Sequence, residues 1–226
     1  ALNRACRLNE YLMHRNKKYV GILRLHKNDV SDKTLKSEMK KLTGKIKQLP
    51  PVRSAVKRAV RERTVHSFKL LEREGKDVLF EAEVQAGTYI RTLCDTLGKA
   101  PAIGGAHMLE LRRIQAGIFE EESKDYPSIN LYDFEKAISD SNTHSLKKIL
   151  IPGEIVATIL PIIKVRKDVV PKVLSGSPIF PTFLEKNQPT FKKDDKVCVF
   201  SDDKFIGCYN YIGSPTLIAK PEFVLN

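Results

Sequence analysis

Residues 64–98 read TVHSFKLLEREGKDVLFEAEVQAGTYIRTLCDTLG, and they are the most informative part of the chain about the fold class. β-branched, aromatic and polar residues mix over 64–71 and again over 78–84, and the Glu-Gly-Lys-Asp sequence between them is typical of a turn. From 90–97 the apolar residues instead recur every three or four positions, as on one face of a helix, and Gly98 is placed to end it. These residues therefore predict a β-hairpin followed by a helix.

Strand and helix patterns continue on both sides of this hairpin. Upstream, the sequence YVGILRL at 19–25 is rich in strand-forming residues. A helix is predicted after Ser31, which is a good N-cap, and Gly44 is placed to stop it. Downstream, residues 107–114 mix apolar and basic side chains and favour a strand. We therefore expect an α+β domain with a mixed, mainly antiparallel sheet and helices.

The C-terminal part of the chain has a different pattern. Residues 120–157 combine an acidic run, proline breaks and one short helix pattern at 131–139, which indicates a connector. Beyond it, a short helix is predicted at 169–174, where a Ser-Gly-Ser-Pro sequence stops it. Short β-rich runs separated by turn residues cover 160–165, 196–201, 205–211 and 217–220. Strands of this length and spacing favour a small β-barrel or sandwich.

The chain is strongly basic, with a net charge of +12 and a pI of about 9.5. Such a surplus fits a partner made of phosphates, and it is concentrated between residues 53 and 63. Small and apolar residues interleave with those charges, as in a loop that grips a nucleic-acid backbone. The alternative is a solvated charge run on a soluble basic protein. A membrane partner is not expected, because no apolar stretch has the length of a membrane helix and no basic helix has a strong apolar face.

The four cysteines are Cys6, Cys94, Cys198 and Cys208. They form no C-x-x-C pair, which argues against a zinc site. Their wide spacing indicates reduced thiols in an intracellular protein. Cys94 and Cys198 stand among apolar residues and are predicted to lie in the core.

Three local motifs occur in order, QLPPVRSAVKR at 48–58, AGTYIRTLC at 86–94 and GGAHMLELRR at 104–113. Together they resemble the TruB branch of the pseudouridine synthases. The first motif is most similar to the archaeal and eukaryotic H/ACA members, the dyskerin-like enzymes. The sequence VLSGSPI at 173–179 resembles part of a PUA domain, the small RNA-binding barrel that follows the catalytic domain in that family. The resemblance covers most of the chain and is weak across 120–155.

The resemblance implies three parts, which are the C-terminal portion of a catalytic domain at 1–119, a connector at 120–157 and a PUA domain at 158–226. It implies an isomerase that breaks the N-glycosidic bond of uridine, turns the base and rejoins it through carbon, without cofactor or metal. The implied substrates are ribosomal RNA chosen by an H/ACA guide RNA, and transfer RNA. The implied partners are these RNAs and the small proteins of an H/ACA particle. Such a protein would be cytoplasmic, or nucleolar in a eukaryote.

Three residues match active-site positions of that family. Tyr19, in the sequence KKYV, matches a tyrosine whose ring stacks on the flipped base and whose hydroxyl can exchange protons. Arg91 matches the arginine of Y-I-R-T-L, which is implied to pair with the catalytic carboxylate and keep it ionised. Tyr89 matches a second tyrosine near the base. The alternatives are a strand-end tyrosine packed on the core for Tyr19 and a surface helix arginine for Arg91.

Further positions are implied to contact the base or the RNA. Leu111 matches an apolar residue that leans on the base, and Lys57 matches the lysine of S-A-V-K, although simple packing and a solvated charge are the alternatives. Gly176 lets an RNA backbone approach because it has no side chain, while a plain helix C-cap explains it equally well. The complete set of expected RNA-contacting residues is Arg53, Lys57, Arg58, Leu111, Lys164, Lys172 and Gly176.

The catalytic aspartate of the family belongs to a G-T-L-D-P type motif, which does not occur in these 226 residues. The first eight residues resemble the helix that follows that motif. Asp95 stands four residues after Arg91 on the predicted helix, and we interpret it as part of an ordinary helix-surface pair. We therefore expect the chain alone to be inactive, with the aspartate supplied by a preceding segment or a separate chain. The alternative is a non-catalytic RNA-binding scaffold.

Overall fold

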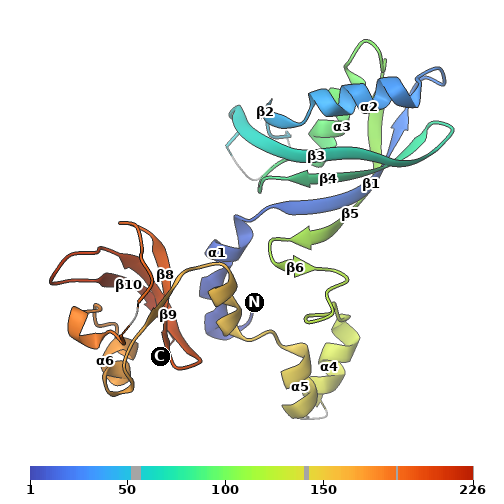
Figure 1. The fold of residues 1–226 in the computed structure, drawn as a ribbon. Helices are drawn as coiled ribbons and strands as arrows, with labels where there is room; N and C mark the ends of the chain where they lie inside the picture. The colour runs from blue at the N-terminus through green and yellow to red at the C-terminus, as the bar shows by residue number, and fades with distance from the viewer. Residues whose placement is uncertain (52–56, 140–142, 187, 226) are drawn as a thin grey trace. The chain divides into compact units, whose positions relative to one another are not determined.

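The structure, a computed structural model, describes residues 1–226 apart from 52–56, 140–142, 187 and 226. The chain forms two compact units (Figure 1). The first, called the sheet unit below, comprises Leu12–Ile129. The second, called the terminal unit, comprises Ala1–Tyr11 together with Asn130–Asn226. The first eleven residues are therefore grouped with the C-terminal part of the chain.

The sheet unit is built on a six-stranded sheet in the order β2-β3-β4-β1-β5-β6, whose neighbouring strands are all antiparallel. The α+β class is thereby confirmed, and so are the hairpin and the strands predicted at 19–25 and 107–114. Strand β2 was not predicted. The strands are β1 (Lys17–Leu25), β2 (Gly44–Gln48), β3 (Arg61–Glu74), β4 (Asp77–Val84), β5 (Ala106–Ala116) and β6 (Phe119–Glu120).

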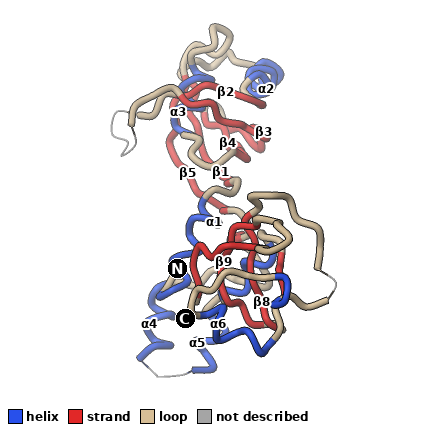
Figure 2. Tube along the Cα trace, turned by 90° about the vertical axis from the view of Figure 1, so that its left-hand side faces the viewer, coloured by secondary structure: helices blue, strands red, loops and turns tan. Residues whose placement is uncertain are grey.

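Two helices pack with this sheet (Figure 2). Helix α2 (Asp32–Lys41) begins after Ser31, whose Oγ accepts a hydrogen bond from the Thr34 amide at 3.1 Å, so the predicted N-cap is confirmed. Helix α3 (Ile90–Gly98) buries its apolar residues. The buried side chains of both helices and of β1, β3 and β4 form one hydrophobic cluster, so both helices contribute to the same core.

Gly98 ends α3 as predicted, but for a different physical reason. Its backbone is not in the left-handed region that a glycine C-cap usually adopts. A Cβ at this position would lie 2.3 Å from the amide nitrogen of Ala106, the first residue of β5. Glycine is required because the end of the helix and the start of the strand touch through their backbones.

The terminal unit contains a smaller sheet in the order β10-β9-β8-β7, with β7 parallel to β8 and the other pairs antiparallel. Isolated bridges join Val165 to Leu184 and Ile179 to Ala219. A separate cluster of buried apolar side chains forms its core. The strands are β7 (Ile162–Lys164), β8 (Lys196–Ser201), β9 (Lys204–Tyr211) and β10 (Ala219–Val224). The unit is β-rich as expected, whereas a closed barrel stays a prediction.

Several short helices complete the chain. They are α1 (Asn9–Met13), α4 (Leu131–Ser139), α5 (Thr143–Ile149) and α6 (Val170–Leu174), with 3-10 helices at Asn3–Leu8, Gly153–Thr158, Lys167–Val169 and Pro181–Phe183. The helix predicted at 131–139 is confirmed with the same bounds, and α5 was not predicted. The strand predicted at 217–220 begins at Ala219, because backbone hydrogen bonds between Ser214 and Leu217 hold a turn before it. Within the described part of the chain, no helix has the length and apolar character needed to cross a membrane.

Candidate active site

Tyr19 and Leu111 lie side by side on one face of the sheet. Tyr19 is half-buried and packs against the core cluster, whereas Leu23, four residues further along β1, is fully buried. In the register of β1 and β5, Gly21 pairs with Leu111 and Tyr19 pairs with Arg113. Side chains of paired residues project to the same side of a sheet. Leu111 is 39% exposed, so an apolar surface beside the tyrosine is open to a ligand.

Tyr89 and Arg91 lie at the start of α3, which packs on the same core. Tyr89 is the N-cap residue and is half-buried, and Arg91 in the first turn is exposed. Ile90 between them is buried in the cluster against which Tyr19 packs. The helix start also carries a partial positive charge, which together with Arg91 favours a carboxylate or phosphate nearby. The predicted trio is therefore arranged around one core.

Gln48, the last residue of β2, holds the backbone of Tyr89. Its side chain is 4% exposed. The Oε1 atom accepts a hydrogen bond from the Tyr89 amide at 3.0 Å, and the Nε2 atom donates one to the Tyr89 carbonyl at 3.2 Å. Our sequence interpretation did not include Gln48 among the site residues. The sequence did carry a signal for Gln48. It stands two residues after Ile46, on the inward face of the strand, and a glutamine amide buried there needs hydrogen-bond partners.

The loop that precedes Tyr89 is braced by hydrogen bonds to β3 and within itself. Gln85 Oε1 accepts a hydrogen bond from the Thr64 amide at 3.0 Å, and the Gln85 amide donates to the Thr64 carbonyl at 2.8 Å. The Thr88 hydroxyl donates to the Gln85 carbonyl at 2.8 Å. Gly87 has a φ of 79°, and a Cβ there would lie 3.2 Å from Nε of Arg63. The loop is therefore held between the strands and an arginine side chain.

Lys17 and Arg113 add positive charge to the same end of the sheet. Lys17 precedes Tyr19 by two residues on β1, and its Nζ donates to the carbonyls of Met13 and, at 2.7 Å, Arg15. Burial, and then the charge of Arg113, lower the pKa of Lys17 below its usual value. Neither cation was among the predicted site residues. By the register of β1 and β5, both cations lie on the Tyr19 face of the sheet.

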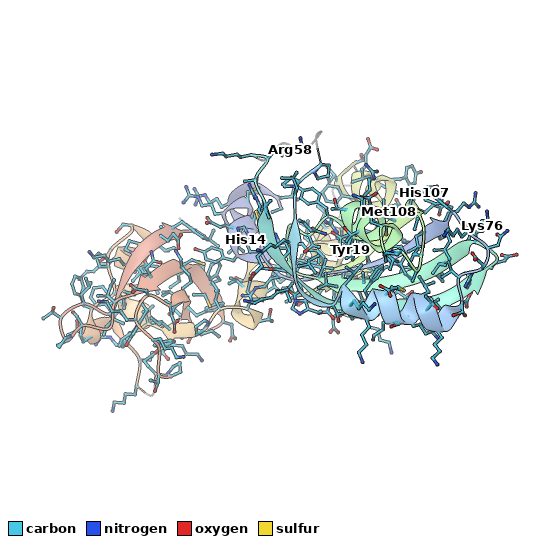
Figure 3. All side chains as sticks on the ribbon, turned by 90° about the horizontal axis from the view of Figure 1, so that it is seen from above. His14, Tyr19, Arg58, Lys76, His107 and Met108 are labelled. Atoms are coloured by element: carbon cyan, nitrogen blue, oxygen red, sulfur yellow. The ribbon has the colours of Figure 1, made fainter. Side chains whose placement is uncertain are left out.

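The basic segment before β3 is described only in part. Arg53 lies outside the described residues. Lys57 and Arg58 are exposed, and the carbonyl of Lys57 accepts a hydrogen bond from Nη2 of Arg61 at 3.3 Å. Figure 3 shows Arg58 at the periphery of the sheet unit and Tyr19 further inside. Both described cations are therefore free to meet an external phosphate.

In the terminal unit, Lys164 and Lys172 are exposed on β7 and α6. The side chain of Gln188 makes two hydrogen bonds with the backbone of Lys164. Its Oε1 accepts one from the Lys164 amide at 3.0 Å, and its Nε2 donates one to the Lys164 carbonyl at 2.9 Å. Gly176 has a φ of 89°, and its amide donates to the Val173 carbonyl at 3.0 Å, as in a helix C-cap. A Cβ at Gly176 would meet nothing within 4 Å, so the surface above it is also open.

Asp95 takes part in an ordinary helix-surface pair, but its partner is not Arg91. The Asp95 carboxylate lies 2.7 Å from Nζ of Lys99, one turn further along α3. Both side chains are largely exposed. The exposed pair with Lys99 agrees with the interpretation of Asp95 as a helix-surface residue.

Two family models match the chain. The TruB family pseudouridylate synthase N-terminal domain matches residues 1–90, and the tRNA pseudouridylate synthase B C-terminal domain matches residues 91–158. The chain belongs to the TruB family of pseudouridine synthases. The second match runs through 120–155, where the motifs alone gave a weak resemblance. The match to the N-terminal domain model ends at Ile90, the first residue of α3.

Relatives with similar sequences also have names that belong to this family. The chain is 34% identical over 206 residues to "Probable tRNA pseudouridine synthase B" of Thermoplasma volcanium, covering 90% of this chain and 57% of the relative. It is 37% identical over 204 residues to the protein of that name from Pyrococcus abyssi, covering 89% of this chain and 60% of the relative. This TruB-family chain therefore spans less than two thirds of the length of these relatives.

Solved structures share the fold. A chain in the crystal structure of a Cbf5-Nop10-Gar1 complex matches with a TM-score of 0.84 and 32% identity, covering 99% of this chain and 70% of that one. A chain in the structure of an H/ACA RNP bound to a substrate RNA containing 2'-deoxyuridine matches with a TM-score of 0.83 and 28% identity, covering 100% of this chain and 71% of that one. The chain therefore shares the fold of one chain in each of these two complexes.

Proposed function

We propose that this chain is part of an RNA pseudouridine synthase that isomerises uridine to pseudouridine. The observation that carries the proposal is the position of Tyr19 beside Leu111 on one sheet face, with Tyr89 and Arg91 at the start of a helix that packs on the same core. An aromatic ring beside an open apolar surface suits a base removed from its stack. A cation at a helix start suits the carboxylate that begins the reaction.

These side chains share two tasks in the proposed reaction, binding the base and holding the catalytic carboxylate. The rings of Tyr19 and Tyr89 and the side chain of Leu111 hold the uracil after the base leaves the RNA stack. Arg91 pairs with the catalytic carboxylate and favours its ionised form. That carboxylate would come from a segment outside these 226 residues, so the chain alone is expected to bind RNA without isomerising it. No cofactor or metal is required.

RNA binding is proposed for both units. In the sheet unit, the exposed Lys57 and Arg58 and the neighbouring Arg53 would contact the phosphate backbone. In the terminal unit, residues 158–226 would act as a PUA domain that receives RNA near Lys164, Lys172 and Gly176. The open space above Gly176 supports this role, because a backbone can approach where no side chain projects. The net charge of +12 supports binding that weakens as salt is added.

The substrate is proposed to be ribosomal RNA selected by an H/ACA guide RNA, with transfer RNA as a second substrate. The solved structures that match are titled as complexes of Cbf5 with Nop10 and Gar1 and as an H/ACA RNP, which supports small protein partners and a guide. The relatives named tRNA pseudouridine synthase B support the transfer RNA substrate. The protein would work in the cytoplasm, or in the nucleolus of a eukaryote.

The test is a pseudouridine assay with the full-length protein. One arm supplies unmodified transfer RNA alone, and the other supplies a ribosomal RNA fragment with a matching H/ACA guide and the small particle proteins. Pseudouridine in the second arm that requires the guide supports the proposal, and product in the first adds transfer RNA as substrate. Tight RNA binding without product in either arm would reject it and favour a non-catalytic scaffold.

A further inference from the structure

The side chain of Gln48 makes the hydrogen bonds that a neighbouring strand would make with Tyr89, the residue just before α3. Its amide accepts from the Tyr89 N–H at 3.0 Å and donates to the Tyr89 carbonyl at 3.2 Å, which is the pairing that a β-ladder would provide. Tyr89 itself has extended backbone angles, with φ −93° and ψ 106°, and no side-chain cap. The backbone of this residue is therefore fixed by a side chain from β2, about forty positions earlier in the sequence.

Burial makes this contact stronger than a surface hydrogen bond. Gln48 is one of only a few buried polar residues in the described part of the chain, and its amide is shielded from water. In such surroundings an unpaired donor or acceptor is costly, so the two hydrogen bonds stabilise a single backbone geometry at Tyr89. Because the helix follows immediately, the same contact fixes the direction of its first turn, which carries Arg91.

Gln48 also joins two parts of the site that are distant in sequence. It is the last residue of β2, and the Pro50-Pro51 pair that follows leads into the basic segment. Prolines limit the freedom of the chain after Gln48. The end of β2 and the residue before α3 are therefore tied to each other through one amide side chain.

We propose that Gln48 is a positioning residue for Tyr89 and Arg91, which sets the geometry of the uridine pocket without touching the base. This inference rests on the proposed isomerase function. A displacement of about 1 Å in a reacting group can lower a rate by about a hundredfold. Loss of the Gln48 contacts should therefore reduce kcat while leaving RNA binding, which depends on the basic surfaces, nearly unchanged.

The test compares three variants of the full-length protein in its complete RNA complex. Gln48→Met keeps the size of the side chain and removes both hydrogen bonds. Gln48→Glu can present the same donor and acceptor only when its carboxyl is protonated. Val65→Ala serves as the matched control, because it truncates a buried residue of β3 in the same sheet without removing either hydrogen bond to Tyr89.

We expect Gln48→Met to lower kcat by about a hundredfold with little change in KM, and to speed hydrogen exchange of the Tyr89 amide. Gln48→Glu should regain activity relative to the unmodified protein as the pH is lowered. Val65→Ala should keep kcat at temperatures where it remains folded. Equal losses of kcat in Gln48→Met and Val65→Ala, or a Gln48→Glu activity ratio independent of pH, would overturn the inference. Inactivity of the unmodified protein would instead reject the proposed function.

Discussion

The ring of Phe80 on β4 lies directly against the backbone of Gly21 on β1. A Cβ at Gly21 would come within 2.7 Å of Phe80 Cζ and within 2.7 Å of the Glu110 carbonyl oxygen on β5. Phe80 is fully buried and contacts Phe68 edge-on, with ring centroids 5.4 Å apart. The absence of a side chain at Gly21 therefore lets a large aromatic ring fill the sheet face between Tyr19 and Leu23.

Substitution of Gly21 by alanine is expected to destabilise the sheet unit by about 1–3 kcal/mol, because the new methyl group overpacks the core and neither the ring nor the strand backbone can give way freely. Thermal unfolding followed by circular dichroism measures the change. Gly153→Ala is the control, since a Cβ there would make contacts of 3.7 and 3.8 Å, which are ordinary. A Gly21→Ala protein as stable as this control would contradict the predicted overpacking at Gly21.

The cysteines should differ sharply in reactivity. Burial raises the pKa of Cys94, Cys198 and Cys208 to about 12 in each case, so their thiolates are scarce near neutral pH. Cys6 is exposed. Iodoacetamide is expected to label Cys6 alone in the folded protein and all four thiols in concentrated urea, as counted by mass spectrometry. Rapid labelling of a second thiol without denaturant would contradict the packing described for the core.

Glu222 gives the terminal unit a pH-dependent link between the N-terminal segment and β10. Glu222 Oε2 accepts from Tyr11 Oη at 2.6 Å and from Lys196 Nζ at 2.7 Å. Burial alone would raise the pKa of Glu222, but the hydrogen bonds from Lys196 and Tyr11 outweigh it and leave the pKa below its usual value of 4.5. The stabilisation is therefore complete above that value and is lost as the pH falls through the lowered pKa.

We expect Tyr11→Phe to lower the free energy of unfolding by about 1 kcal/mol at neutral pH, since one hydrogen bond to a carboxylate is removed. The difference from the unmodified protein should shrink in acid, when Glu222 becomes protonated. Urea unfolding at a series of pH values measures both effects. Tyr132→Phe, at a side chain that is 72% exposed, should have no effect at any pH. A Tyr11→Phe penalty that grows in acid would refute the assigned pairing.

Much of the fold could be predicted from the sequence because local patterns and tertiary packing agree. The apolar face of 90–97 is the face that packs into the core, and the Ser31 hydroxyl caps α2 as its position indicated. Strand β2 escaped prediction because its polar residues face solvent at the sheet edge, leaving only Ile46 and Gln48 turned inward. Short segments with so few apolar residues give no reliable periodicity.

Candidate site residues could be predicted only where a motif supplied them. Tyr19, Tyr89 and Arg91 were predicted through resemblance and stay candidates, whereas Gln48 is hydrogen-bonded to the backbone of Tyr89 and no local pattern reveals this partner. The partner of Asp95 was also not predictable, because Arg91 and Lys99 stand at equal spacing on either side of it. Such choices depend on side-chain geometry that spacing does not determine.

Single-turnover pseudouridine formation with Arg91→Gln in the full-length protein tests whether Arg91 stands in the uridine pocket. The control is Arg24→Gln, which removes the same charge from an exposed arginine paired with Asp77 at 2.6 Å. The rate with Arg91→Gln is expected to fall by about a hundredfold or more, because the carboxylate loses its partner, while the control stays close to the unmodified protein. Equal rates for the two variants would exclude Arg91 from the active site.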